Sequence, residues 1–328
     1  MPQHLGQLHG RGGASPTAAA GAAPLPCERR RFLIVHNPMA GRNRVDLVRD
    51  IVRRLEQAGA RADQHVLGDH ERDEHFLAHV GMYDALIASG GDGTARSVVA
   101  MLHGHQVPFG LIPIGTGNVL AEELHLPQGA AEIADMLLHG PVVDISIASA
   151  NGAPFLLMLG AGFDGDVIAR LLIGLKRRIG KLAFGWPILA ALAHKPQLFQ
   201  VTIDGAGYET SWLVAANAAR YAGRFLLSER TNVRSPGLNV IISHATSRRQ
   251  RFRELLHLVA GRLEKASSIE MIPAHEVAIP DAKTIAVQVD GEAISAPSFR
   301  LVADMARTPM IVPTWPAGRE PLRGRAGR

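Results

Sequence analysis

The first half of the chain alternates short apolar runs with segments of helical periodicity. Strand-like runs occupy residues 31–38, 62–67, 83–90 and 108–115. Helical spacing or composition marks residues 45–55, 71–80, 94–103, 118–124 and 130–139. Strands that alternate with helices are typical of a parallel sheet with helices on both faces. We therefore predict an α/β domain over residues 31–145.

After Pro141 the pattern changes to strand-like segments that are mostly joined by turns. These segments are VVDISIA, FLLMLGAG, LFQVTID, TSWLVAANA, LNVIISHA, IEMIPAHEVAI and KTIAVQVDGEA. Helical stretches near 166–192 and 248–263 interrupt them. This pattern predicts a mainly antiparallel β domain over residues 146–312. Residues 1–30 and 313–328 are rich in Gly, Ala, Pro or Arg, and we expect a disordered extension and a flexible tail.

Composition narrows the classes of function. A chain of 328 residues suits two domains, and 35 basic against 30 acidic side chains suit phosphate-bearing ligands or an anionic membrane. Only 5% of residues are aromatic, and no aromatic-plus-basic cluster predicts a nucleic-acid partner. The single cysteine, Cys27, excludes an intrachain disulfide and fits the cytoplasm. No uninterrupted apolar run is long enough to predict a membrane span.

The strongest chemical signal is GGDGT, which follows a buried strand and opens a helix. Glycines at 90, 91 and 93 let backbone N–H groups approach phosphate oxygens, and the helix N-terminus adds partial positive charge. Asp92 suits a Mg²⁺ ligand or a base, because phosphoryl transfer needs a metal to offset charge. A tight turn capped by Asp92 is the alternative interpretation. We predict nucleotide binding by Gly90, Gly91, Asp92, Gly93 and Thr94, with Asp92 as the metal ligand.

Two further polar loops follow neighbouring strands. PIGTGN offers a threonine hydroxyl and an asparagine that can cap the next helix, and HNPMAGR offers another glycine-containing turn. Loops at the carboxyl ends of parallel strands face the same crevice, although each loop alone could be a plain turn. We predict further nucleotide contacts from Asn37, Pro38, Gly41, Gly115, Thr116, Gly117 and Asn118.

The segment VQVDGEA, residues 287–293, supports two interpretations. Asp-Gly is a hairpin signal, so the segment could be a plain β-hairpin. Alternatively, Asp290 and Glu292 face a cleft between the domains, where one of them supplies an acid/base group.

These motifs occur in a characteristic order. NPxxG, GGDGT and PxGTGN precede GAGFDGDV (160–167), AAN (215–217) and DGE (290–292). The order resembles the diacylglycerol kinase catalytic domain family, which includes bacterial lipid kinases and sphingosine kinases and is distantly similar to NAD kinases. The resemblance runs from about Phe32 to beyond Glu292, and LAEELHLP (120–127) looks like the bacterial lipid-kinase branch.

The resemblance implies a fold, a reaction and roles for matched residues. The fold would be a three-layer α/β nucleotide-binding domain followed by a β-sandwich-like domain, with the active site between them. The reaction would transfer the γ-phosphate of ATP, with Mg²⁺, to the hydroxyl of a diacylglycerol-like lipid or long-chain base in phospholipid biosynthesis. Asp290 or Glu292 would accept the proton from that hydroxyl. The choice between them stays open, and Asp92 is a third candidate base.

Three departures keep alternatives open. The family continues GGDGT with Leu/Ile-Asn-Glu, whereas this chain has Ala95, Arg96 and Ser97. HVLGD (65–69) lacks a nucleotide-facing threonine, and SPGLNV (235–240) lacks the carboxylates of an Asp-Asp-Gly loop that holds a structural Mg²⁺. The alternatives are a NAD kinase-like enzyme on a soluble substrate and a non-catalytic nucleotide- or lipid-binding homologue.

One basic segment suggests a location. Residues 167–203 contain no Asp or Glu and combine Lys and Arg with apolar side chains. Such a segment predicts peripheral contact with an anionic membrane, or a surface helix packed on the β domain. We expect a cytoplasmic protein with this peripheral contact, and a homo-oligomer stays open.

Overall fold

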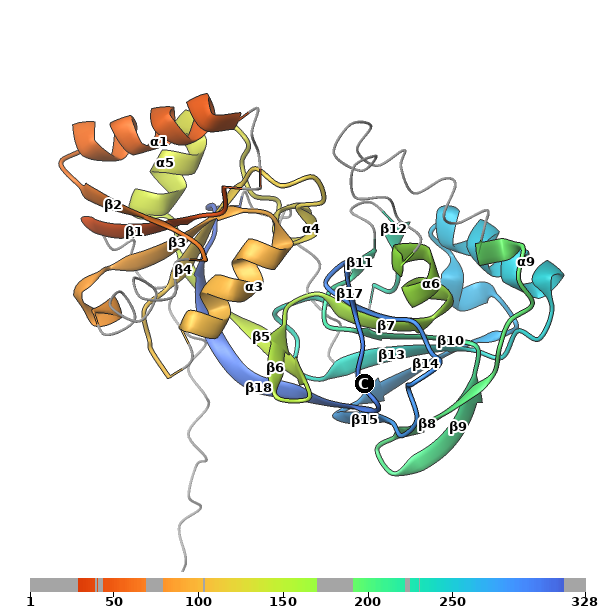
Figure 1. Cartoon of the computed structure of the whole chain (residues 1–328). Coiled ribbons are helices and arrows are strands. Elements are labelled where there is room, and N and C mark those ends of the chain that lie inside the picture. Colours follow the sequence, from red (N-terminus) through yellow and green to blue (C-terminus); the bar gives the residue numbers. More distant parts are fainter. Residues whose placement is uncertain are drawn as a thin grey trace, which may run out of the picture.

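The computed structural model describes residues 29–38, 40, 44–68, 79–102, 104–169, 191–221, 225–229 and 231–315. In this part of the chain an α/β half is followed by a mainly antiparallel β half (Figure 1). The predicted fold class is therefore confirmed. Gly41, the polar helix expected at 71–80 and most of the basic segment lie outside the described residues.

The first half is built on parallel strands in the order β2-β1-β3-β4-β18. Its first strands are β1 (Arg31–His36), β2 (Arg61–Val66), β3 (Ala85–Gly90) and β4 (Phe109–Pro113). Its helices are α1 (Val45–Gln57), η2 (Val80–Met82), α3 (Asp92–Met101), α4 (Val119–Glu123) and α5 (Ala130–His139). In Figure 1, α1 and α5 cover one face of the sheet and α3 covers the other. The helical spacing recognised in α1 buries Val48, Ile51, Val52 and Leu55.

The second half is a β-sandwich. One layer is an antiparallel sheet of β14 (Ile269–Ala274), β13 (Leu238–Ser243), β10 (Trp212–Ala216), β7 (Met158–Gly162), β16 (Val287–Val289) and β17 (Glu292–Ile294), in that order. The other contains β5 (Val142–Ala150), β6 (Ala153–Phe155), β8 (Phe199–Ile203), β9 (Ala206–Thr210), β15 (Glu276–Ile279) and β18 (Phe299–Ile311). Side chains from both layers form one buried apolar cluster, which holds the layers together.

A few short elements complete the second half. They are α6 (Phe163–Ala169), β11 (Arg220–Tyr221), β12 (Phe225–Leu226), α9 (Arg248–Val259) and η4 (Leu263–Lys265). Both α6 and α9 lie against the six-stranded sheet, on the side away from β15 (Figure 1). No helix in the described part of the chain is both long and apolar enough to cross a membrane.

The long strand β18 joins the two halves (Figure 1). Its first residues pair antiparallel with β15, and Met310 near its end pairs parallel with β4. The pattern along the sequence did not predict this strand. Charged residues interrupt the alternation, and Asp304 has a left-handed backbone with φ 50° at an irregularity in the pairing with β5. The last strand therefore returns to complete the first sheet.

The stretch IEMIPAHEVAI was predicted as one strand, and the structure divides it at His275. The part before His275 forms β14 in the six-stranded sheet, whereas the part after it forms β15 in the other sheet. Asp204, in the β8–β9 turn, accepts hydrogen bonds from the backbone N–H groups of His275 and Glu276 and so holds the corner. A continuous apolar run cannot reveal such a change of sheet.

The chain contacts the core slightly beyond residues 31 and 312. Arg29 is buried, and its Nε atom donates to the backbone oxygen of Leu137 at 2.7 Å. At the other end, Trp315 Nε1 donates to the backbone oxygen of Leu124 at 3.1 Å. Both contacts reach the α4–α5 region.

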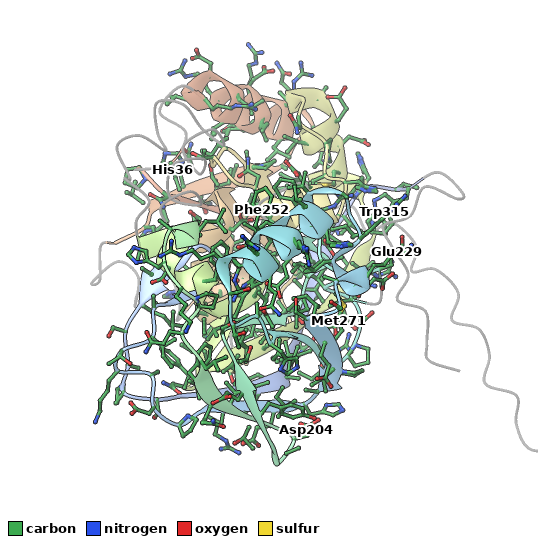
Figure 2. All side chains as sticks on the ribbon, turned by 90° about the vertical axis from the view of Figure 1, so that its right-hand side faces the viewer. His36, Asp204, Glu229, Phe252, Met271 and Trp315 are labelled. Carbon is green, nitrogen blue, oxygen red and sulfur yellow. The ribbon has the colours of Figure 1, made fainter. Side chains whose placement is uncertain are left out.

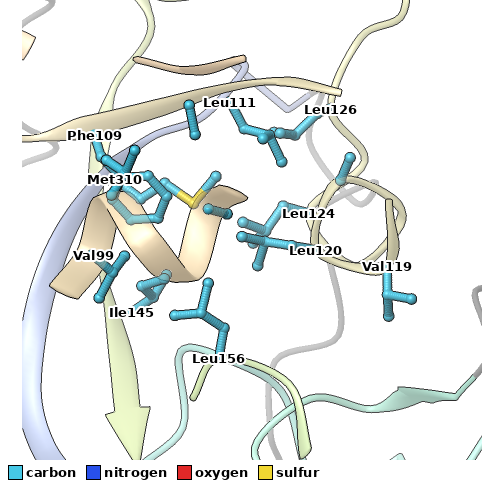
Figure 3. Close-up of a cluster of buried hydrophobic side chains, with 14 of the residues drawn as sticks. Val99, Phe109, Leu111, Val119, Leu120, Leu124, Leu126, Ile145, Leu156 and Met310 are labelled. Carbon is cyan, nitrogen blue, oxygen red and sulfur yellow. The ribbon is translucent and has the colours of Figure 1, made fainter. Parts of the chain in front are cut away.

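A buried cluster supports the segment that follows β4 (Figure 3). It combines side chains of α3, β4, α4, β5 and β18, including Val99, Phe109, Leu111, Leu120, Leu124, Ile145, Leu156 and Met310. Because α4 has only five residues, this packing rather than helix propensity fixes its place. The loop between β4 and α4 is thereby held on a rigid base.

Candidate functional site

Three loops meet at the carboxyl ends of β1, β3 and β4, as the sequence predicted. The backbone N–H of Asn37 donates to the oxygen of Ser89 at 3.1 Å, and Asn37 Nδ2 donates to Thr94 Oγ1 at 3.2 Å. The loop after β1 is thus tied to the GGDGT loop. Thr94 is buried, so its hydroxyl serves this internal contact.

The GGDGT and GTGN loops touch through bare backbone. A Cβ atom added at Gly115 would lie 2.5 Å from the Cα of Gly91, and one at Gly90 would lie 2.1 Å from Thr94 Oγ1. Only glycine permits these approaches without displacing the neighbouring loop. The result is a strip of exposed main chain at the edge of the sheet, of the kind that cradles phosphates.

Replacing Gly115 with alanine is expected to reduce the free energy of unfolding by about 1–3 kcal/mol, because the new methyl group overlaps the backbone of Gly91. Gly81 is a matched control, since a Cβ there meets nothing within 4 Å. Gly81→Ala should change stability by less than about 1 kcal/mol. Urea unfolding measures both variants, and equal stability of the two would show that the loops do not touch.

Asp92 connects the same two loops through its carboxylate. Its oxygens accept hydrogen bonds from the backbone N–H groups of Val119 and Leu120, each at 3.0 Å. These N–H groups belong to the first turn of α4 and have no partner within that helix. Asp92, at the start of α3, therefore caps the N-terminus of α4. Helix α3 also begins at Asp92, two residues before the predicted start at Thr94. Asp92 thus fixes the geometry of the cradle.

Asn118 occupies the N-cap position of α4, but its side chain does not cap the helix as predicted. It adopts a left-handed conformation with φ 51°, and Nδ2 donates back to the backbone oxygens of Pro113 and Gly115. Its Oδ1 atom is buried and has no hydrogen-bond partner among the described residues. A buried acceptor without a partner is costly, so this atom suits a donor on a ligand.

The segment VQVDGEA forms the predicted hairpin, with Asp290 and Gly291 both at positive φ between β16 and β17. The carboxylate of Asp290 is half-buried and accepts three backbone N–H groups, from Leu156, Leu157 and Met158, at 2.9 to 3.1 Å. Burial raises the pKa of Asp290 to about 6, and these hydrogen bonds oppose the rise. Asp290 therefore clamps the hairpin onto the turn between β6 and β7.

Glu292 lies across from the cradle. Its side chain is 57% exposed, forms an ion pair with Arg96, and reaches within 2.8 Å of where a Cβ of Gly93 would stand. Arg96, on the first turns of α3, also donates to the backbone oxygen of Val289 at 3.2 Å. Of the two carboxylates in DGE, Glu292 is thus the one that meets the GGDGT loop.

The departures from the family pattern have their own contacts. Ser97, where the family has an acid, donates its hydroxyl to the backbone oxygen of Gly93 at 3.1 Å, within α3. In SPGLNV, the backbone N–H of Gly237 donates to Asp304 Oδ2 at 2.7 Å, and Ser146 also donates to Asp304. Arg96, at the position of the family's asparagine, makes the contact with Glu292. This substitution therefore bears directly on the candidate site.

Three buried polar residues of the quoted motifs make contacts that the sequence did not reveal. Glu123 of LAEELHLP accepts the backbone N–H groups of Ala219 and Arg220, and burial raises its pKa. Asp164 of GAGFDG accepts Gln288 Nε2 at 2.6 Å and the Tyr221 hydroxyl, and burial raises its pKa as well.

The third is the asparagine of AAN, Asn217. Its Nδ2 atom donates to the backbone oxygens of Ser146 and Leu156, each at 2.8 Å. All three residues lie in motifs that the sequence singled out. Their side chains join segments far apart in the chain, which the motif letters alone do not reveal.

The residues present fit a nucleoside triphosphate and a divalent cation. Glycines keep the main chain of both loops free of side chains, and Asn118 Oδ1 is a buried acceptor without a partner among the described residues. In the described part of the chain, no three His, Cys, Asp or Glu side chains gather into a metal cluster. Mg²⁺ commonly binds through one or two carboxylates together with substrate phosphates, and Asp92 is the carboxylate within the glycine-rich loop.

The sequence of the chain is similar to those of several known proteins. The chain is 27% identical over 307 residues to a diacylglycerol kinase of Mycobacterium tuberculosis, covering 89% of this chain and 94% of that protein. It is 30% identical over 188 residues to a diacylglycerol kinase of Bacillus subtilis, covering 54% of this chain and 60% of that protein. A match at 30% identity to an uncharacterized Synechocystis protein covers 54% of this chain and 38% of that protein.

Solved structures and family descriptions give the same picture. A crystal structure of a diacylglycerol kinase from Bacillus anthracis superposes with a TM-score of 0.66 at 22% identity, covering 88% of this chain and 98% of that one. Residues 31–150 match the diacylglycerol kinase catalytic domain, and residues 158–311 match the YegS C-terminal NAD kinase beta sandwich-like domain. The chain therefore belongs to the diacylglycerol kinase catalytic domain family.

Proposed function

We propose that this protein is an ATP- and Mg²⁺-dependent lipid kinase that phosphorylates a lipid hydroxyl in the cleft between its two halves. One observation carries the proposal. The Glu292 side chain from the second half reaches the Gly93 backbone of the first, so a carboxylate stands opposite a phosphate-type cradle. A base that faces bound phosphates is the arrangement that transfer to a hydroxyl requires.

In this proposal the three loops bind the triphosphate. Backbone N–H groups of the GGDGT and GTGN loops contact phosphate oxygens, and the start of α3 adds partial positive charge. Asp92 keeps the two loops in register through its hydrogen bonds to Val119 and Leu120. Mg²⁺, held by phosphates and by Asp92, would offset the charge that develops during transfer.

We assign the proton acceptor to Glu292 rather than Asp290. Asp290 is half-buried and bound by three backbone N–H groups, whereas the Glu292 side chain is 57% exposed beside the GGDGT loop. In the transfer step, the lipid hydroxyl gives its proton to Glu292 and its oxygen bonds to the γ-phosphorus. The bond from that phosphorus to the β–γ bridging oxygen breaks, and ADP leaves.

We assign Arg96 a positioning role. Its two contacts, with Glu292 and with the Val289 oxygen, orient the carboxylate toward Gly93. Arg96→Ala is expected to lower kcat by about 10–100-fold with a smaller change in the KM for ATP, because the base is misplaced. Arg96→Lys keeps the charge but loses one of the two hydrogen bonds, so its kcat should lie between those of wild type and Arg96→Ala.

The balance between kcat and KM separates positioning from a structural defect. A misplaced base lowers kcat in Arg96→Ala while the KM for ATP changes little, and Arg96→Lys should restore part of the lost kcat. Unfolding in urea serves as the control for stability. An unchanged kcat would remove Arg96 from the account.

The acceptor class is tested by running two reactions in parallel with labelled ATP. One contains a total lipid extract and the other contains NAD, and the products are partitioned between organic and aqueous phases. Label in the organic phase supports the lipid kinase. Label on NAD would favour the NAD kinase-like alternative. ATP binding without transfer would favour the non-catalytic alternative, which Ser97 suggests because the family has an acidic residue at this position.

We further propose that the protein acts in the cytoplasm, where its single cysteine stays reduced. The lipid substrate would be drawn from a membrane surface. The basic segment 167–203 remains a predicted contact with that surface, since its residues 170–190 lie outside the described part of the chain.

A further inference from the structure

Helix α9 turns its polar side toward the protein. Arg251 and Glu254 are buried and form an ion pair at 2.7 Å, and Arg251 also donates to Ser211 Oγ at 2.7 Å. The guanidinium lies 5.1 Å from the ring centre of Phe163 and 5.2 Å from that of Trp212. The Arg251–Glu254 pair, through its contacts with Ser211 and Trp212, anchors α9 to the six-stranded sheet. The opposite side of the helix faces away from the sheet.

The outward side of α9 is apolar. Phe252, Leu256 and Val259 are 53%, 53% and 66% exposed, and their spacing places them along one side of the helix. They are three of the seven strongly exposed large hydrophobic residues in the described part of the chain. Figure 2 views the molecule from the α9 side, with Phe252 labelled on this helix. Clustered exposed apolar side chains mark an interaction surface, whereas single ones do not.

The exposed formal charges of α9 itself have one sign. Arg248, Arg249 and Arg253 of α9 are exposed, whereas Glu254, the one acidic residue of the helix, is buried against Arg251. The arginines and Phe252 line a groove of about 390 Å³ together with Leu192. Apolar side chains flanked by arginines match a surface that combines hydrocarbon with negative charge, which is the surface of an anionic bilayer.

We propose that the outward side of α9 is a docking surface for an anionic membrane. Phe252, Leu256 and Val259 insert at the level of the lipid headgroups, and the exposed arginines contact lipid phosphates. Docking through α9 does not depend on the kinase reaction, so it is measured without nucleotide. It also differs from the contact predicted for residues 167–203, because the inserted side chains and the contacting arginines all lie on α9, and only Leu192 of that segment lines the groove.

The test is flotation of the full chain with vesicles of phosphatidylcholine alone or mixed with phosphatidylglycerol. Wild type should float with the mixed vesicles at low salt and much less at high salt or without phosphatidylglycerol. Arg249→Gln combined with Arg253→Gln should weaken binding roughly 10–30-fold, at about fivefold for each arginine near the surface. Phe252→Ser should weaken it about tenfold, because one aromatic side chain no longer leaves water.

Matched controls come from the first half of the chain. Arg49→Gln combined with Arg53→Gln removes the same charge from exposed positions on α1, and Met82→Ser removes a 56% exposed apolar side chain. Both controls should float like wild type, and all these exposed variants should unfold at the wild-type urea concentration.

Three outcomes would overturn the proposal. Wild type could fail to float with anionic vesicles. The α9 variants could float like wild type, which would place the contact elsewhere on the chain. Light scattering could show a dimer that only the α9 variants dissociate, which would assign the stripe to a second copy of the protein.

Discussion

Replacing Glu292 with glutamine is expected to lower turnover by about 10²–10⁴-fold, the usual contribution of a general base. Glutamine keeps the size of the side chain and its place beside Gly93, but it cannot accept the proton of the lipid hydroxyl. The KM for ATP should change little, because the loops that bind phosphate are untouched. Initial rates over a range of ATP concentrations measure both quantities.

A second arginine–glutamate pair on the chain provides the control. Glu276 pairs with Arg300 through contacts of 2.8 and 3.0 Å on β15 and β18, and both side chains are exposed. Glu276→Gln removes the same kind of pair away from the loops and should leave turnover unchanged. Both variants should unfold at close to the wild-type urea concentration, because exposed ion pairs contribute little to stability. If Glu292→Gln turned over like Glu276→Gln, Glu292 would not be the base.

Replacing Asp290 with alanine is expected to reduce the free energy of unfolding by about 2–5 kcal/mol at neutral pH. Three backbone N–H groups would lose their buried acceptor, and each unsatisfied donor costs on the order of 1–3 kcal/mol when the site cannot relax. Asparagine tolerates the left-handed backbone at position 290 and keeps one acceptor oxygen. The free energy of unfolding of Asp290→Asn should therefore lie between those of wild type and Asp290→Ala. Urea unfolding measures all three proteins.

The same substitution changes the dependence of stability on pH. Burial raises the pKa of Asp290 from 3.8 to about 6, so the folded protein binds this proton more tightly than the unfolded chain does. The resulting stability is fully present below about pH 4 and is lost as the pH rises through about 6. The stability gap between wild type and Asp290→Ala should therefore widen by about 3 kcal/mol on acidification. A gap that narrows instead would show that the carboxylate is favoured in the fold.

The loops of the candidate site were predictable because their signals are local. GGDGT, GTGN and the Asn-Pro turn each follow an apolar run, and parallel strands bring such ends together by geometry. The hairpin at Asp290 was predictable for a similar reason, since Asp-Gly supplies two residues that tolerate positive φ. The layered fold followed from the change in periodicity after Pro141.

The distinction between Asp290 and Glu292 was not predictable from the sequence. The two carboxylates are two residues apart, and their different surroundings come from distant segments: the backbone of 156–158 for Asp290, and Arg96 with Gly93 for Glu292. Arg96 stood out only as a departure from the family pattern. Its partner lies 196 residues away along the chain, beyond the reach of any local pattern.

The strand β18 escaped prediction for a physical reason. Its first residues pair within the sandwich and Met310 near its end pairs with the parallel sheet, so no single alternation of buried and exposed positions describes it. Asp304 breaks the pattern further, because its carboxylate accepts Ser146 and Gly237 instead of facing solvent. Polar residues that bond within the fold look like loop residues in the sequence.

The most direct test of the proposed function is transfer of labelled γ-phosphate from ATP, with Mg²⁺, to a total lipid extract. Wild type, Glu292→Gln and Glu276→Gln are assayed together, and ATP binding is measured for each protein. The proposal predicts organic-phase label with wild type and Glu276→Gln, almost none with Glu292→Gln, and ATP binding by all three. Absence of organic-phase label with wild type that binds ATP, or undiminished label with Glu292→Gln, would contradict it.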